Sequence, residues 1–183
     1  MKMMKMLLIC LLFISFNTYA QKYTPVDTAS KVYFVIKNFG IGTGGDFTGL
    51  KGNVTFLPES PADCKFDVSV ATSTVDTNNG MRDKSLTGDE YFEAAKFPLI
   101  TIVSSKIEKT NKTAAGFYYF TGNITIKGIT KPIAFPFQAK EEKNGYLFTG
   151  NFNITRSDFG VGSQSIVLSN EVAVTLSVFA KKN

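Results

Sequence analysis

The amino-acid sequence predicts an all-β fold of antiparallel strands in a single domain, and three observations lead to this prediction. Apolar and polar residues alternate with a period of two along most of the chain, which is typical of strands with one buried and one wetter face. Turn-forming residues such as Lys143-Asn144-Gly145 separate the alternating runs. The chain also has 17 Phe and 7 Tyr but no Trp, a large supply of aromatic rings for a core.

Residues 1–20 have the features of a cleavable signal peptide. An apolar run at residues 6–16 follows two lysines, and the small residues Thr18 and Ala20 stand near the end of the segment. The apolar run is too short to span a bilayer. We therefore expect a soluble mature chain that starts at Gln21, forms one domain over residues 21–183, and is periplasmic or secreted.

The alternating runs predict about eight strands. Their apolar positions fall within residues 32–36, 54–56, 64–70, 100–102, 120–126, 133–137, 148–154 and 172–178. Pro132 and Pro136 lie in one of these runs and predict a strand edge or a bulge there. Between Gly80 and Lys96 the apolar spacing is closer to helical, so we expect a helical insertion over residues 83–95, either one short helix or two helical turns split by Gly88.

Antiparallel strands in this number can form either a two-layer sandwich or a closed barrel. Closure removes the unpaired strand edges that would otherwise favour aggregation. The interior of an eight-stranded barrel is either filled by side chains or holds one small ligand. The period of the alternation does not choose between these structures.

The composition argues against most catalytic and metal-binding chemistry. The chain has no histidine, which is the commonest general base and a common metal ligand. Cys64 is the one cysteine outside the signal peptide, and its place in an alternating run predicts a small buried side chain instead of a reactive thiol. The sequence therefore predicts a protein that is not an enzyme and has no metal site and no cofactor.

The charge distribution argues against nucleic-acid binding. The formal charge of +5 falls to +3 without the two lysines of the signal peptide, and the basic residues are scattered along the chain. A mild positive charge is compatible with transient contact with an anionic membrane. The run Gly40-Ile41-Gly42-Thr43-Gly44-Gly45 matches a dinucleotide-binding fingerprint, but the residues after it do not favour a helix. We expect a hairpin connection there.

Two polar segments, residues 76–83 and 155–162, each contain an arginine close to an aspartate in a predicted turn. Arg82 and Arg156 can pin these turns through charge-assisted hydrogen bonds. Alternatively, their planar guanidinium groups can meet a polar or anionic head group at the mouth of a barrel. The residues themselves leave both interpretations open.

Four segments resemble the YceI-like lipid/polyisoprenoid-binding family. They are residues 34–56, with GDFTGLKGNVTF at their end, residues 75–107, residues 120–137 (FTGNITIKGITKPIAFPF) and residues 154–162 (ITRSDFGVG). The resemblance covers nearly the whole mature chain. It implies an extended, eight-stranded antiparallel, lipocalin-like barrel with a helical insertion, export to the periplasm, and binding of an isoprenoid chain inside the barrel. It also makes a homodimer plausible.

If the chain follows this family, its inward-facing apolar residues would line the ligand site, although each could equally be plain core. They are Phe34, Ile36, Phe56, Val68, Val70, Ile100, Ile102, Phe120, Ile124, Phe135, Phe137, Phe148, Phe152, Val174 and Leu176. At a polar mouth we expect Arg82 and Arg156. Asn38 and Ser85 would join them, because they stand where the resemblance often places histidine, so the head-group preference of this chain would differ.

The combined expectation is an exported binding protein that holds an apolar lipid of the isoprenoid or quinone type for sequestration or transport. The alternative is a packed barrel that acts as an envelope stress or interaction module without a lipid ligand. An internal cavity would favour the first hypothesis and a filled interior the second.

Overall fold

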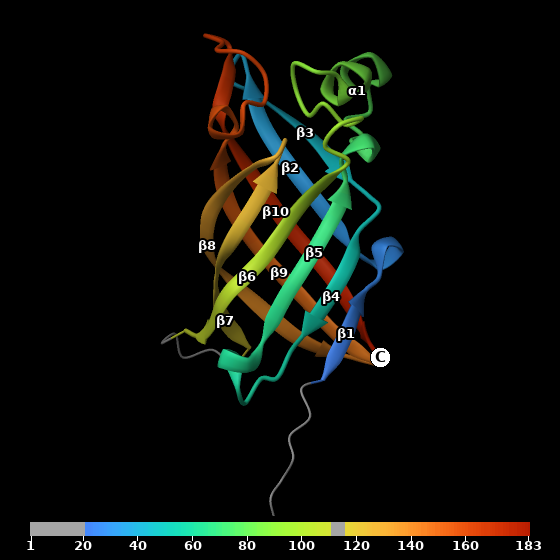
Figure 1. Ribbon diagram of the computed structural model, residues 1–183, viewed down its shortest axis with the longest axis vertical. Coiled ribbons are helices and arrows are strands. Elements are labelled where there is room, and N and C mark those ends of the chain that lie inside the picture. The colour runs from blue at the N-terminus through green and yellow to red at the C-terminus, as the bar shows by residue number, and fades with distance from the viewer. Residues whose placement is uncertain (1–20, 111–115) are drawn as a thin grey trace, which may run out of the picture.

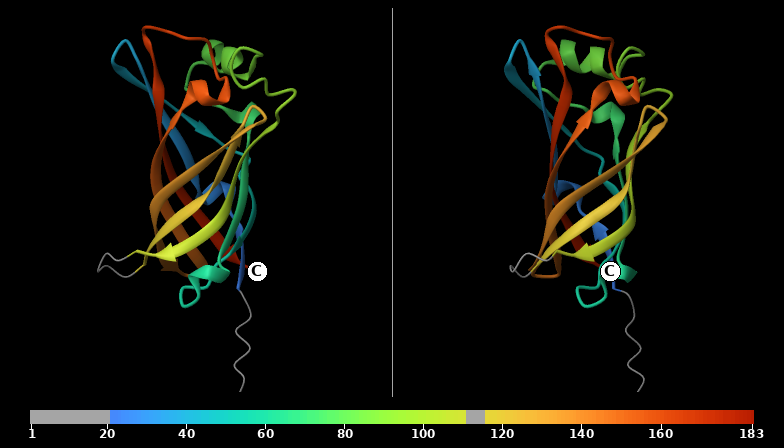
Figure 2. Two further views of the ribbon diagram at one scale, coloured as in Figure 1. Left: turned by 60° about the vertical axis from the view of Figure 1, so that its left-hand side comes forward. Right: turned by 90° about the vertical axis from the view of Figure 1, so that its left-hand side faces the viewer.

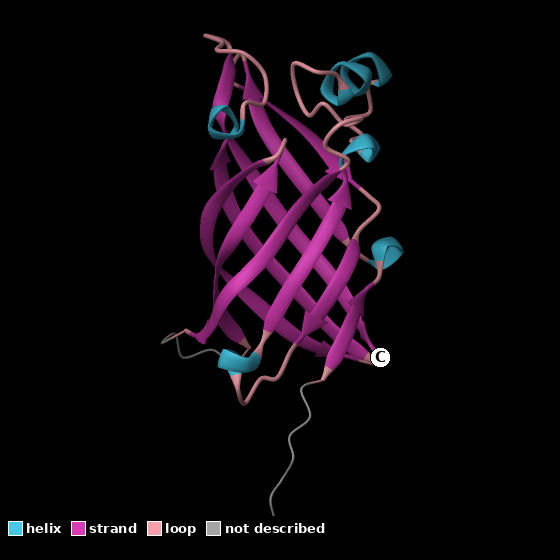
Figure 3. Cartoon of the chain, viewed as in Figure 1, coloured by secondary structure: helices cyan, strands magenta, loops and turns pink. Residues whose placement is uncertain are grey.

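The computed structural model describes residues 21–110 and 116–183, and the predicted signal peptide lies outside these ranges. The described chain is an antiparallel β-barrel with short helical segments at its ends (Figures 1 and 3). In chain order the elements are β1 (Lys22–Pro25), η1 (Asp27–Ala29), β2 (Lys31–Asn38), β3 (Ile41–Phe47), β4 (Lys51–Thr55), η2 (Pro61–Asp63), β5 (Lys65–Ala71), η3 (Thr72–Thr74), α1 (Gly80–Thr87), β6 (Leu99–Lys109), β7 (Phe117–Ile126), β8 (Ile129–Glu142), β9 (Gly145–Thr155), η4 (Arg156–Phe159) and β10 (Leu168–Lys182).

The strands close into an eight-stranded barrel, as predicted, although ten segments are assigned. β1 and β2 are two parts of one strand interrupted by η1, and both pair with the long strand β10. β3 pairs with β2, while β4 pairs with β1 and β5, so β3 and β4 also continue one another. The β1–β10 pairing closes the ring, which removes an otherwise unpaired edge at that end of the barrel.

The two ends of the barrel differ. The mouth end carries α1, the β2–β3 turn, the β7–β8 turn and the loop that leads into β10, whereas β1 begins and the chain ends at the opposite, floor end (Figures 1 and 2). No helix in the described ranges is long and apolar enough to cross a membrane.

The ladder between β8 and β9 covers part of each strand. It runs from Phe137 opposite Gly150 to Glu142 opposite Gly145. Residues 129–136 of β8 pair with β7, and residues 151–155 of β9 pair with β10. We call this stretch between β8 and β9 the seam. Pro132 and Pro136 lie in the β8 part of the seam. Because β8 has no ladder with β9 there, a residue without a backbone N–H can be accommodated, in agreement with the predicted strand edge.

The helical insertion is shorter and begins earlier than the sequence predicted. α1 spans Gly80–Thr87, and the segment up to residue 97 consists of turns instead of a second helical stretch. The Asn79 side chain caps the helix by accepting a hydrogen bond from the Arg82 N–H. Gly88 stands at the C-cap and ends the helix, so it does not split a longer helical segment as the sequence predicted.

The floor end of the interior is packed with rings. Phe56 is fully buried, and the rings of Phe66, Tyr118, Tyr146 and Phe148 surround it with centroids 5.0–6.3 Å away in edge-to-face arrangements. These residues, together with Phe137, form what we call the aromatic floor. It contains six of the 24 Phe and Tyr residues of the chain.

Candidate functional site

Above the aromatic floor the barrel encloses a cavity of about 770 Å³. This volume lies within the range of about 300–1,000 Å³ that is typical of small-molecule sites. A second space of about 60 Å³ lies deeper, and Phe66, Phe120, Phe137 and Phe148 are among its walls. The interior therefore has a filled half and a hollow half.

Strand register explains why the cavity wall is apolar. Directly opposite residues of an antiparallel pair point to the same face of the sheet. Phe34, Val174 and Phe152 therefore form one row across β2, β10 and β9, and all three line the cavity. On the other wall, Val68, Ile102 and Ile124 form a corresponding row across β5, β6 and β7.

Ten of the fifteen predicted lining residues surround this cavity. They are Phe34, Ile36, Val68, Val70, Ile100, Ile102, Ile124, Phe152, Val174 and Leu176. Of the other five, Phe120, Phe135, Phe137 and Phe148 border the small deeper space. Phe56 lies in the floor itself. A ligand would reach these five only by extending below the main cavity.

All four predicted mouth residues, Asn38, Arg82, Ser85 and Arg156, line the same cavity. Its described lining also includes the polar side chains of Asn79 and Gln164 but no aspartate or glutamate. The two guanidinium groups are thus the charged groups of this lining. Their positive charge is not opposed by a carboxylate within the wall.

Arg82 is held in place through Thr77. Its Nε donates to Thr77 Oγ1 at 2.7 Å, and its Nη2 donates to the Thr77 carbonyl oxygen at 2.8 Å. Asp83 does not pair with Arg82 but accepts hydrogen bonds from the backbone N–H and the hydroxyl of Thr77. Because these bonds use two of the five donor hydrogens of Arg82, others remain for water or a ligand. The guanidinium both pins the turn and faces the mouth.

Arg156 has a different role. Its side chain is 4% exposed, and it donates to the carbonyl oxygens of Ser169, Val161, Ser163 and Leu168 at 2.9–3.3 Å. The guanidinium therefore organises the loop between η4 and β10, which forms part of the mouth. The interpretation that an arginine pins its own turn describes this residue well.

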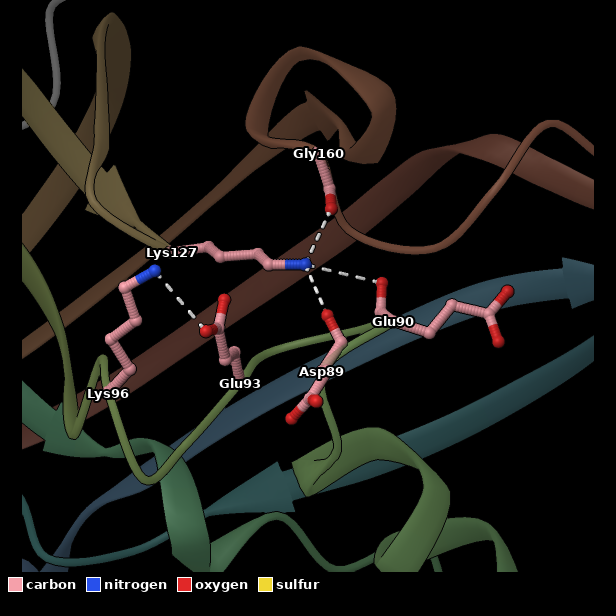
Figure 4. Close-up of polar contacts among 6 residues, drawn as sticks. All are labelled: Asp89, Glu90, Glu93, Lys96, Lys127 and Gly160. Atoms are coloured by element: carbon pink, nitrogen blue, oxygen red, sulfur yellow. Dashed lines mark hydrogen bonds and ion pairs between the residues drawn. The ribbon is translucent and has the colours of Figure 1, made fainter.

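Lys127 ties three parts of the mouth end together. It lies in the β7–β8 turn, and its ammonium donates to the carbonyl oxygens of Asp89 at 2.6 Å, Glu90 at 3.4 Å and Gly160 at 3.2 Å (Figure 4). The Glu90 carbonyl also accepts a hydrogen bond from the Gly162 N–H at 2.9 Å. These contacts fasten the segment after α1 to the loop after η4.

Several cavity residues were not predicted because they lie outside the alternating runs. Phe92 follows α1, and Phe159 and Val161 lie in and after η4, yet all three line the cavity. Irregular segments have no apolar period that could reveal the direction of a side chain. For Phe92, the signal available in the sequence was the number of apolar residues between positions 88 and 97, which indicates that this segment packs against the barrel.

Three comparisons place the chain among known proteins. The YceI-like domain model matches residues 23–180. The protein UPF0312 YE1254 of Yersinia enterocolitica (serotype O:8, biotype 1B) is 34% identical over 154 residues, covering 80% of this chain and 78% of the relative. The crystal structure of Burkholderia cenocepacia BcnA, 26% identical, superposes with a TM-score of 0.79 and covers 86% of this chain and 99% of the other.

A more distant structure shares the architecture. It is a polyisoprenoid-binding domain from Saccharophagus degradans that is implicated in plant cell wall breakdown. It is 16% identical, has a TM-score of 0.72, and covers 88% of this chain and 98% of that domain. At this identity the likeness concerns the fold. The match of the domain model over residues 23–180, supported by the Yersinia relative, shows that the chain belongs to the YceI-like domain family.

Proposed function

We propose that this protein is an exported, non-enzymatic lipid carrier that holds an apolar ligand of the isoprenoid or quinone type in its barrel. The observation that carries the proposal is the apolar cavity of about 770 Å³ above the packed floor. Burial of apolar surface is non-directional and scales with area, so such a wall suits a flexible hydrocarbon chain. The polyisoprenoid-binding domain of the same fold supports this ligand class.

The proposed pose places the chain of the ligand among the rows of Phe34 and Val68, with its end on the aromatic floor. The polar end lies at the mouth near Arg82, Asn38 and Ser85. Because the lining has arginine and no carboxylate, it favours a head group that accepts hydrogen bonds. A packed interaction module would not need this unfilled space.

The proposal is tested by mass spectrometry of an organic extract from protein that is purified from its native host. A stoichiometric lipid with a long apolar chain is the expected result. Val174→Phe, which adds a ring to the wall and narrows the cavity, should reduce the amount of extracted lipid, and Thr175→Phe on the outer face of the same strand should not. A clean extract from the wild-type protein, or equal lipid in both variants, would contradict the proposal.

A further inference from the structure

The mouth end exposes apolar side chains to an unusual degree. Among the described residues, the four most exposed large apolar side chains are Ile166 (104%), Met81 (83%), Phe39 (75%) and Ile41 (72%). We call these four residues the apolar rim. These residues belong to the β2–β3 turn, the first position of β3, α1 and the loop before β10, which all lie at the mouth end (Figures 1 and 2).

The apolar rim is continuous with the cavity. Met81 itself lines the cavity, and so do Asn38, beside Phe39, and Ser165 and Val167, on either side of Ile166. The Phe39 N–H donates to the Val167 carbonyl oxygen at 2.9 Å, which joins the β2–β3 turn to the loop before β10. The rim residues therefore surround the opening of the cavity.

Phe39 occupies a backbone position that disfavours it. Its φ is +50° and that of Gly40 is +77°, so both turn residues are in the left-handed region. Hairpin turns of this kind favour Asn-Gly, and a bulky aromatic residue there is uncommon. Neither the turn conformation nor core packing accounts for this phenylalanine. Strained residues of this type often belong to functional surfaces.

The charges around the rim are mainly positive. The rim segments are residues 37–42, α1 (Gly80–Thr87) and residues 163–168, and they contain Lys37, Arg82 and Lys84. Their one acidic residue is Asp83, whose carboxylate accepts two hydrogen bonds from Thr77. Outside these segments, the Glu90 carboxylate adjoins the rim by accepting a hydrogen bond from the Ser163 hydroxyl at 3.1 Å, so three cations stand against two carboxylates. Apolar side chains flanked by cations are the combination that binds the interface of anionic bilayers.

We propose that the apolar rim docks on the surface of a bilayer that contains anionic lipid, with the cavity mouth facing the membrane. Phe39, Ile41, Met81 and Ile166 enter the interfacial region, while Lys37 and Lys84 contact anionic head groups. The inference rests on the proposed function, because a ligand with a long apolar chain resides in membranes before it enters a carrier. Docking in this orientation lets the ligand move between bilayer and cavity without crossing water.

Flotation with vesicles tests the proposal. The wild-type protein should bind vesicles of phosphatidylcholine mixed with phosphatidylglycerol more tightly than vesicles of phosphatidylcholine alone. The variant Phe39→Asn/Ile41→Thr/Ile166→Ser should bind the mixed vesicles about tenfold more weakly. The matched control is Val103→Thr/Tyr119→Ser, which removes two exposed apolar side chains from strands β6 and β7 and should bind like the wild type.

The single variant Phe39→Asn separates docking from a structural role. Asparagine tolerates the left-handed conformation, so the melting temperature should stay the same or rise while vesicle binding falls. Absence of wild-type flotation, or equal flotation of the wild type and the triple variant, would overturn the proposal. So would a triple variant that changes a dimer to a monomer in light scattering, because the rim would then contact a second copy.

Lipid extracts of the same samples distinguish this proposal from the proposed function. If the extract contains no lipid but flotation depends on the rim residues, membrane docking is supported and the lipid-carrying function is contradicted. A lipid-loaded protein that does not float would overturn docking and leave the carrier function in place.

Discussion

The rings of Phe135 in β8 and Phe152 in β9 stack with their centroids 4.6 Å apart and an interplanar angle of 23°. The contact crosses the seam, where the strands lack a shared ladder of hydrogen bonds. Phe120 of β7 continues the stack on Phe135 at 4.9 Å. Side-chain packing therefore holds the barrel together at a point where backbone pairing does not.

We expect Phe152→Ala to lower the free energy of unfolding by about 3–5 kcal/mol, because it removes a buried ring from the seam. Urea unfolding measures this loss. A double-mutant cycle with Phe135→Ala should show a coupling of about 0.5–1.5 kcal/mol. The corresponding cycle between Phe152 and Phe56, which lies in the floor, should be additive. Equal coupling in both cycles would contradict a specific contact at the seam.

Lys127→Met should loosen the mouth end without unfolding the barrel. The change removes the hydrogen bonds that join the β7–β8 turn to the carbonyls of Asp89, Glu90 and Gly160. The lysine is half-buried but its hydrogen bonds lie at the surface, so the global loss should be about 1 kcal/mol or less. Amide hydrogen exchange should become faster in residues 88–97 and 156–162.

The matched control for this change is Lys140→Met. Lys140 forms an exposed ion pair with Glu142 at 2.7 Å on the neighbouring strand β8. Such surface pairs contribute about 0–1 kcal/mol, and no exchange rate at the mouth should change. Unaltered exchange in Lys127→Met would show that the three carbonyl contacts do not restrain these loops.

Arg156→Lys should be strongly destabilising although it conserves the charge. The guanidinium donates to four carbonyl oxygens in a planar arrangement, and an ammonium on a shorter side chain cannot reach all of them. We expect a loss of about 2–5 kcal/mol in thermal or urea unfolding, because buried carbonyls lose their partners. Arg82→Lys, at the exposed end of the mouth, should cost about 1 kcal/mol or less.

Alkaline pH should destabilise the floor end. Burial raises the pKa of the Cys64 thiol and of the Tyr23, Tyr118 and Tyr146 hydroxyls above their ordinary values of 9.0 and 10.0. The unfolded chain loses these protons first, so it binds fewer protons than the folded chain above about pH 9. The contribution of these four groups to the free energy of unfolding is therefore fully present below this pH. It is lost as the pH rises through the folded pKa values.

Cys64→Ala and Tyr23→Phe test this pH dependence. Compared with the wild type, Cys64→Ala should have a flatter stability profile above about pH 9, and Tyr23→Phe should have one above about pH 10. In the folded protein at neutral pH, the Cys64 thiol should also react slowly with an alkylating reagent, because it is buried and largely protonated. Rapid alkylation under these conditions would show that the floor opens readily.

The alternation of apolar residues was sufficient to predict strands, and the resemblance was needed to choose the barrel. The depth of each side chain along the barrel axis could not be predicted. This depth depends on how far neighbouring strands are staggered, and the period-two alternation contains no information on stagger. Phe34 and Phe56 look equivalent in sequence, yet one lines the cavity and the other is the centre of the floor.

The irregular segments were predicted least well. The apolar spacing predicted a helical segment from residue 83, whereas α1 begins at Gly80, directly after Asn79, whose side chain caps the helix. The contacts of Lys127 depend on three loops that meet only in the folded barrel, so no local pattern could have revealed them. The residues Arg82 and Arg156 were predicted together, but their different partners became visible only through the fold.

The division of the interior into a filled and a hollow half also gives the barrel an uneven resistance to opening. Rings in mutual contact around Phe56 should keep the floor end closed on the timescale of global unfolding, whereas the cavity end has fewer internal contacts to break. Local fluctuations at the mouth end can then admit a bulky molecule while the floor end stays folded. A bound chain would supply the missing contacts, so occupancy should slow hydrogen exchange in the strands around the cavity far more than in the floor.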